Sequence, residues 1–200
     1  MPQINPTRGR PASTTREEVA RIALDLFARQ GFDETTIDDI ARAVGVGRRT
    51  LFRYFSSKND TVWGDFELVC ERLRAELAAR PTDEPLMTTL RHAVVASNTY
   101  PDDQLPDLRI RMTLITTVSA LQAHSMLRYE AWRRVIADFA AHRLAQHPDD
   151  HLPQTIAHAA LGTSMAAFVV WVDDPSRDLA ATIDAGYRAL AGGFSTSSSR

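Results

Sequence analysis

Arginine and aromatic side chains alternate in residues 45–58, GVGRRTLFRYFSSK, directly after a glycine turn. On a helix with about 100° between successive residues, Leu51 falls on one side while Arg49 and Arg53 fall on the other. A guanidinium group can donate two parallel hydrogen bonds to O6 and N7 of guanine in the major groove. The spacing therefore predicts a short helix that presents cations to base pairs.

Other groups on and beside this helix could also contact DNA. An aromatic ring on its flank can contact a thymine methyl group, and a phenol or an ammonium group can reach a phosphate. A threonine that begins an earlier helix could hold another phosphate with its hydroxyl and the neighbouring amides. The predicted contacts are Thr36, Arg48, Arg49, Thr50, Phe52, Arg53, Tyr54 and Lys58.

Two alternatives stay open for these cations. Arginines on a solvated helix can pair with carboxylates such as Asp38 and Asp39 and bind nothing else. Arg8 and Arg10, in the extended TRGRP segment, could lie in a narrow A·T minor groove. An arm of this kind can equally be a tail whose arginines are incidental.

Helix signals surround the basic segment. A capping box of Thr14 and Glu17 and a stop at Gly31 predict a first helix over 15–30. A second helix should follow the cap at Thr36 and end at the glycine turn. Two short helices joined by a three-residue turn form a helix-turn-helix.

The rest of the chain also has helical periodicity and no strand-like alternation. The predicted fold is all-α with about nine helices, in which a three-helix DNA-binding domain precedes a larger ligand-binding and dimerisation domain. The expected domains are a disordered basic arm at 1–12, the helix-turn-helix domain at 13–58, the larger domain at 59–194 and a disordered tail at 195–200. The helices expected after the third are 57–80, 84–99, 106–117, 119–146, 153–172 and 176–192.

Charge is distributed unevenly, although the net charge of the chain is −2. Residues 1–58 carry ten basic and seven acidic side chains, whereas residues 59–200 carry thirteen and eighteen. A basic first part on an acidic body suits a DNA-binding unit attached to a regulatory unit. The single cysteine, the lack of a secretory signal and the expectation that no apolar run reaches a membrane span indicate a cytoplasmic protein without membrane contact.

The last two expected helices suggest a dimer. Small residues recur along 153–172, and 176–192 has an apolar stripe at i, i+4 spacing. Two such helices from each subunit would form a four-helix contact. The alternative is that both stripes pack within one chain.

A small-molecule pocket is expected in the segment 108–134, which mixes apolar and polar side chains. An apolar wall would suit an acyl chain, and an arginine at the mouth would suit a phosphate or carboxylate. The alternative is ordinary core with surface arginines. The candidate ligand contacts are Met112, Ile115, Thr116, His124, Leu127, Arg128, Trp132 and Arg133.

Other chemistry has little support in the sequence. HPDDH at 147–151 lies between two expected helices and has no second cluster to complete a metal shell, so a loop is expected. Cys70 lacks a resolving partner and is expected to be a small buried residue. No nucleotide-binding or nucleophile motif occurs, so neither catalysis nor a metal or cofactor is expected.

Residues 14–60 resemble the N-terminal domain of the TetR family of bacterial regulators, on the segment ALDLFARQGFDETTIDDIARAVGVGRRTLFRYFSSK. The resemblance implies an all-α homodimer that reads bases with its third helix and holds a ligand in its C-terminal domain. Phe52 stands where the family more often has tyrosine. The phosphate contact that the tyrosine hydroxyl would make is then lost.

LQAHSMLRYEAWRR at 121–134, DDHLPQT at 149–155 and FRYFSSKNDTVWGDF at 52–66 are similar to regulators of mycofactocin biosynthesis clusters. That similarity implies a repressor released by long-chain acyl-CoA. The function expected is thus a dimeric repressor of a palindromic operator that an apolar effector releases. The alternatives are a regulator whose C-terminal domain only dimerises or binds a protein, and, more remotely, a helical acyl-CoA carrier or enzyme.

Overall fold

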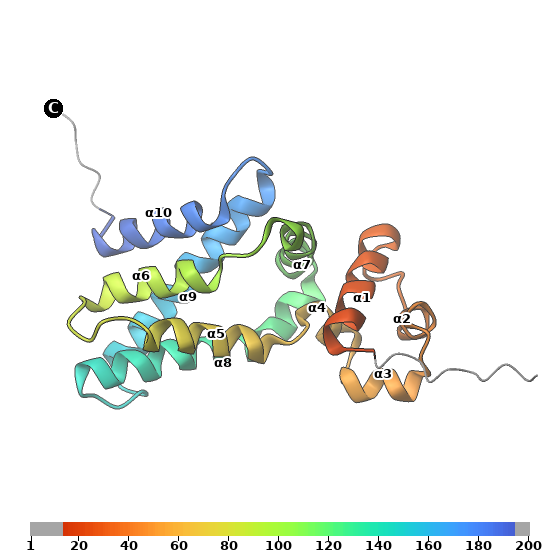
Figure 1. The fold of residues 1–200 in the computed structure, drawn as a ribbon, viewed down its shortest axis with the longest axis horizontal. Coiled ribbons are helices and arrows are strands. Elements are labelled where there is room, and N and C mark those ends of the chain that lie inside the picture. The colour runs from red at the N-terminus through yellow and green to blue at the C-terminus, as the bar shows by residue number, and fades with distance from the viewer. Residues whose placement is uncertain (1–13, 195–200) are drawn as a thin grey trace, which may run out of the picture. The chain divides into compact units, whose positions relative to one another are not determined.

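The computed structural model describes residues 14–194, whose regular secondary structure is entirely helical, with no strand (Figure 1). The all-α prediction is confirmed for these residues. Arg8 and Arg10, with the predicted arm, and the predicted tail at 195–200 lie outside them. The helices are α1 (Arg16–Gln30), α2 (Ile37–Val44), α3 (Arg48–Tyr54), α4 (Lys58–Trp63), α5 (Phe66–Ala78), α6 (Leu86–Ser97), the 3-10 turn η1 (Asp102–Gln104), α7 (Leu105–Thr117), α8 (Ser119–Leu144), α9 (His151–Asp173) and α10 (Leu179–Ala191).

The chain divides into two compact units at Gly64, Met1–Gly64 and Asp65–Arg200. The single helix expected over 57–80 is wrong, because Gly64 takes φ 63° and ψ −136° and separates α4 from α5. Glycine adopts this left-handed backbone without the steric cost of a Cβ atom. As α4 packs against α1, it belongs to the first unit, which therefore extends beyond the expected boundary at residue 58.

The first unit is held together by apolar faces of α1, α2 and α3. Leu24 of α1, Ile40 of α2 and Leu51 of α3 are each fully buried. The N-cap of α1 is Thr15, whose hydroxyl accepts the Glu18 amide at 3.1 Å, one residue later than the expected Thr14–Glu17 box. These contacts fix the base on which α3 is presented.

The second unit is a helical bundle in which α9 packs against both α8 and α10, and α6 packs against α5 and α10. Figure 1 shows α5, α6 and α10 side by side. The buried Tyr187 hydroxyl joins α10 to α9 by a hydrogen bond to the Ala160 carbonyl and a contact with Ser164, both 3.0 Å long. A buried hydroxyl with two partners fixes how α9 and α10 pack.

Helix α9 is more apolar than the sequence pattern suggested. Its most apolar 18-residue window has a mean hydropathy of 1.5, and 28% of that window is buried within the chain. By length and composition alone, this helix would suit a membrane span. The expectation that no apolar segment approaches the length of a membrane span is therefore wrong for α9. The residues that interrupt its apolar run are polar but uncharged, so the mean hydropathy of the helix stays high. One such helix also fits a surface that another protein subunit covers.

Candidate DNA interface and effector cavity

The glycine turn between α2 and α3 sets the angle of the basic helix. Gly45 takes φ 76° and donates its amide to the carbonyls at the end of α2, which ends that helix in a left-handed cap. A side chain at this position would be strained whatever space surrounds it. The chain then passes through Gly47, the N-cap of α3. These features form the predicted helix-turn-helix.

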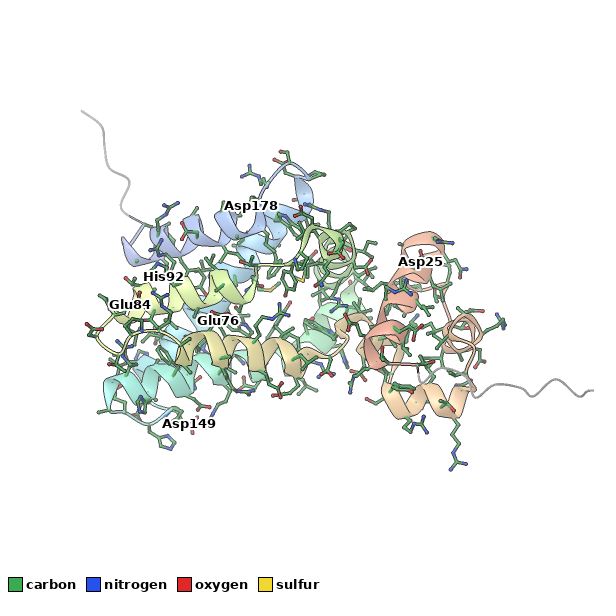
Figure 2. The ribbon with its side chains drawn as sticks, in the orientation of Figure 1. Asp25, Glu76, Glu84, His92, Asp149 and Asp178 are labelled. Atoms are coloured by element: carbon green, nitrogen blue, oxygen red, sulfur yellow. The ribbon has the colours of Figure 1, made fainter. Side chains whose placement is uncertain are left out.

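The two faces of α3 are as the helical wheel predicted. Leu51 and Phe55 are 0% and 2% exposed, whereas Phe52 is 41% exposed and Arg49 and Arg53 are exposed. Figure 2 shows nitrogen-tipped side chains extending from α3 away from α1. Within the described residues Arg49 has no ion pair or hydrogen bond. This outer face therefore offers guanidinium groups that can donate to base edges.

Arg48 and Thr50 lie beside this outer face. The Arg48 guanidinium is 3.3 Å from a carboxylate oxygen of Asp38, and both side chains are exposed. The same guanidinium lies 5.6 Å from the ring centre of Phe52. Exposed ion pairs contribute about 0–1 kcal/mol, so this pair can open to engage DNA. Thr50 is half-buried.

Tyr54 and Lys58 have partners inside the first unit. The Tyr54 hydroxyl donates to the Thr14 carbonyl at 2.7 Å. The Lys58 ammonium donates to the carbonyls of Phe32 and Thr35 at 2.7 and 3.1 Å and lies 4.2 Å from the centre of the Phe32 ring. The sequence could not reveal these contacts, because they join residues far apart in the chain. Both side chains brace the helix-turn-helix.

Thr36 begins α2 with the predicted cap. Its hydroxyl accepts the Asp39 amide at 3.2 Å, and its own amide donates to the Asp39 carboxylate at 3.0 Å. The Thr36 hydroxyl also donates to the Asp39 carboxylate at 2.5 Å. This bond, with the bond from the Thr36 amide and the Arg42 guanidinium, lowers the pKa of Asp39 from 3.8 to about 2. The reciprocal bonds satisfy amides at the start of the helix.

This capping box predicts a pH dependence. Because the pKa of Asp39 is lower in the folded state, its carboxylate stabilises the fold above about pH 4, and this stabilisation is lost as the pH falls toward 2. Asp39→Asn should lower the melting temperature of the first unit at pH 7 and leave it unchanged near pH 2. Melting curves at both pH values, with Asp33→Asn as the matched control, test this. Equal melting temperatures at pH 7 would contradict it.

The candidate ligand residues of the second unit differ widely in exposure. Met112, Ile115 and Trp132 are at most 7% exposed, whereas Leu127 is 76% exposed. Thr116, His124, Arg128 and Arg133 are half-buried. The Arg133 guanidinium donates to Glu130 and contacts His158, and the Thr116 hydroxyl donates to the Met112 carbonyl at 2.8 Å.

A cavity of about 440 Å³ opens elsewhere in the same unit. It lies between the end of α6, η1, the start of α7 and the junction of α9 and α10. None of the eight candidate ligand residues lines it. The lining residues are Asn98, Thr99, Tyr100, Asp102, Leu105, Pro106, Arg109, Trp171, Pro175, Arg177, Asp178, Leu179 and Ala180. Sequence reasoning missed the cavity because its wall is assembled from two separate segments.

Arg109 is the best-fixed cation of the cavity. Its guanidinium lies 3.9 Å from the centre of the Trp171 ring and donates to the carbonyls of Trp171 and Val172 at the end of α9. The sign of its charge suits the C-terminal end of a helix dipole. These contacts hold the planar group in one orientation at the cavity wall.

The HPDDH segment and Cys70 have structural roles. In the HPDDH segment the His147 amide donates to Asp150 at 2.9 Å and Asp149 pairs with Arg134 at 3.0 Å, in the loop before α9 (Figure 2). Within residues 14–194 no group of three potential metal ligands occurs. Cys70 is fully buried, and burial raises the pKa of its thiol to about 11, so the thiol stays protonated at neutral pH.

Known proteins share both units. A family model described as bacterial regulatory proteins, tetR family, matches residues 19–61, and the MftR C-terminal domain matches residues 84–195. The chain is 40% identical over 186 residues to a Mycobacterium tuberculosis protein provisionally named mycofactocin biosynthesis transcriptional regulator MftR, and the match covers 93% of this chain and 94% of that protein.

Solved structures show the same fold. FadR from Bacillus subtilis, in complex with stearoyl-CoA, matches with a TM-score of 0.63 and 18% identity over 88% of this chain and 97% of that chain. FadR from Thermus thermophilus, in complex with lauroyl-CoA, matches with a TM-score of 0.57 and 22% identity over 91% and 96%.

A helix-turn-helix with an exposed basic helix, followed by a larger helical domain, defines a DNA-binding transcriptional regulator rather than an enzyme. The chain belongs to the TetR family, and its C-terminal domain is of the MftR type. The expected family and the expected mycofactocin-regulator subgroup are both confirmed.

Proposed function

We propose that the protein is a repressor that binds a palindromic operator as a homodimer and acts in the cytoplasm, where the DNA is. The exposed face of α3 carries this proposal, because Arg49, Phe52 and Arg53 are available to base edges while the opposite face is buried. Two such helices must enter successive major grooves, about 34–36 Å apart. One face of one chain reads only a half-site, so a second copy is needed.

Arg49 should carry a large share of operator recognition. Arg49→Ala is expected to weaken operator binding by about 1–3 kcal/mol per half-site, because a bidentate contact with guanine is lost. The operator is first obtained by sequencing genomic fragments retained by the purified protein, and affinities are then measured by fluorescence anisotropy. Arg21→Ala, on an exposed face of α1, is the matched control. An unchanged affinity of the Arg49 variant would remove this residue from the contact set.

The dimer is proposed to form through α9. The apolar i, i+4 stripe expected to contribute from 176–192 packs inside the single chain instead, because Leu179, Ile183 and Tyr187 of α10 are at most 3% exposed. Helix α9 has an exposed apolar stripe at i, i+4, i+7 and i+8 spacing, made by Gly162, Ala166, Val169 and Val170. Val169 and Val170 are 43% and 42% exposed in the single chain. A second copy related by a two-fold axis would cover this stripe with the same stripe of its own.

The effector is proposed to be a long-chain acyl-CoA that releases the operator. Support comes from the two FadR structures, whose complexes contain lauroyl-CoA and stearoyl-CoA. Gel-shift titrations with stearoyl-CoA, and with coenzyme A as control, test the proposal. Operator release by stearoyl-CoA alone is expected. If neither compound changes operator affinity, the C-terminal unit only dimerises or binds a protein, and the effector proposal fails while the operator proposal stands.

A further inference from the structure

We propose that the cavity beside Arg109 is a binding site for a small monocarboxylate with an apolar body. The cavity volume of about 440 Å³ lies within the range of about 300–1,000 Å³ that is common for small-molecule sites. Its wall is divided about evenly between polar and apolar residues, so it offers groups that can fix the orientation of a ligand as well as an apolar surface. All the lining residues belong to the second unit and none to the DNA-binding helix, so the inference goes beyond the proposed repressor function.

Arg109 supplies the anion-binding group. Its Nη1 atom donates to the carbonyls of Trp171 and Val172. Its Nε and Nη2 atoms donate to no described residue, and neither atom is fully buried. These N–H groups are therefore accessible to a ligand. Because the guanidinium is already held against the Trp171 ring at 3.9 Å, a carboxylate would bind without ordering a flexible side chain.

Tyr100 supplies a second polar group in the same wall. Its hydroxyl makes no hydrogen bond to any residue between 14 and 194, although the side chain is half-buried. Burial raises the pKa of this phenol, so the hydroxyl stays neutral at physiological pH and can donate a hydrogen bond. Tyr100 and Arg109 line the same cavity, so a carboxylate in it would find a hydroxyl and a guanidinium to bind. The Arg72 guanidinium lies 5.3 Å from the centre of the Tyr100 ring, and Arg72 and Arg111 place positive charge near the phenol.

The remaining charges of the wall favour a ligand with one negative charge. Asp102 and Asp178 lie in the lining, and the Asp178 carboxylate is the N-cap of α10, accepting the Ala181 amide at 2.6 Å. Arg177 is paired with Asp174 at 3.1 Å and does not offset them. A phosphate dianion would be repelled by these carboxylates more strongly than a monoanion.

The apolar part of the wall would hold the body of the ligand. Leu105 and Pro106 come from the start of α7, and Leu179 and Ala180 come from the start of α10. An uncharged apolar molecule would cover the Arg109 N–H groups without accepting their hydrogen bonds, which is costly. An alcohol of equal chain length would offer these N–H groups one neutral oxygen and no charge, so the site should bind it more weakly than a carboxylate.

Calorimetric titration of the full chain with sodium octanoate tests the inference. Saturable binding is expected, with 1-octanol and octyl phosphate each binding at least about tenfold more weakly. Tyr100→Phe should raise the octanoate dissociation constant about tenfold, because only the hydroxyl is removed. Arg109→Gln should abolish binding. Thr117→Val, which removes an exposed hydroxyl of α7 outside the cavity, is the matched control and should bind normally.

Three results would overturn the inference: no saturable octanoate binding, equal binding by the Tyr100→Phe variant, or equally tight binding of octyl phosphate. Melting curves of each variant show whether it is folded, and the Tyr100 variant keeps the test valid if the Arg109 variant does not fold. Operator binding is measured on the same preparations. Its absence would refute the repressor proposal without affecting the octanoate result, so the two failures are distinguishable.

Discussion

Replacing Lys58 with methionine is expected to destabilise the first unit and weaken operator binding while leaving the salt dependence of binding unchanged. The Lys58 ammonium joins the start of α4 to the loop before α2 through the carbonyls of Phe32 and Thr35. Hydrogen bonds to charged groups contribute about 1.5–3 kcal/mol each to stability, and methionine leaves both carbonyls without this donor. The loop leads directly into Thr36, so the position of α2, and with it α3, should become less defined.

Two measurements separate this bracing role from the phosphate contact expected for Lys58. Hydrogen exchange on the full chain reports the opening free energy of amides in residues 16–54 and in residues 66–191 separately, and only the first set should lose protection. A phosphate contact would instead make the slope of log K against log salt less steep by about 0.9 for each phosphate lost. A reduced slope with unchanged protection would show that Lys58 leaves its carbonyl partners and binds DNA.

Arg53→Ala is the matched control for this experiment. The Arg53 side chain is exposed, and its one contact within the described chain places the guanidinium 5.5 Å from the centre of the Tyr54 ring. Surface substitutions of this kind usually change stability by less than about 0.5 kcal/mol. The Arg53 variant should bind the operator more weakly but keep normal hydrogen-exchange protection. The Lys58 variant should instead lose protection in the first unit.

Periodicity was enough to predict which side of α3 is buried. Leu51 and Phe55 lie four residues apart on one face, and an apolar pair at that spacing has to meet the rest of its unit. The caps at Thr36 and Gly45 follow from equally local rules of backbone geometry. These features need only a few neighbouring residues, so one sequence contains all the information.

The partners of Lys58 and the cavity around Arg109 depend on contacts distant in sequence. Lys58 reaches carbonyl groups that any residue type could supply, so no side-chain pattern marks them. The cavity brings residues 98–109 to residues 171–180, and that meeting is set by how the helices pack. The candidate pocket at 108–134 was inferred from composition alone, which does not distinguish a core face from a cavity wall.

The exposed face of α9 could likewise not be predicted from composition. Its apolar character is evident in the sequence, but which residues remain uncovered depends on packing against α8 and α10. Pro153, Ala157, Ala160, Ser164, Ala167 and Trp171 are buried within the single chain. The uncovered stripe lies on another face of the helix, where Gly162 has open space beside its Cα atom. An exposed apolar face of this kind is typical of a surface that binds a partner.

Ala166→Glu is expected to convert the proposed dimer into a monomer and weaken operator binding by about 10²–10⁴-fold, because the two half-sites are no longer bound by one linked molecule. Ala166 is exposed in the single chain and lies at the centre of the stripe formed with Gly162, Val169 and Val170. In a two-fold contact each glutamate would be buried close to its symmetry mate, so desolvation and like-charge repulsion act together. Sedimentation velocity and operator titration measure the two effects.

The matched control is Ala123→Glu, which introduces the same side chain at an exposed alanine of α8. Both substitutions place glutamate, a good helix former, on a solvent-facing helix position, so both variants should keep the melting temperature of the isolated chain. Only the Ala166 variant should sediment as a monomer. If it remains a dimer with normal operator affinity, the stripe on α9 is not the subunit contact, and the apolar surface of α9 must be covered by a partner other than a second copy of this chain.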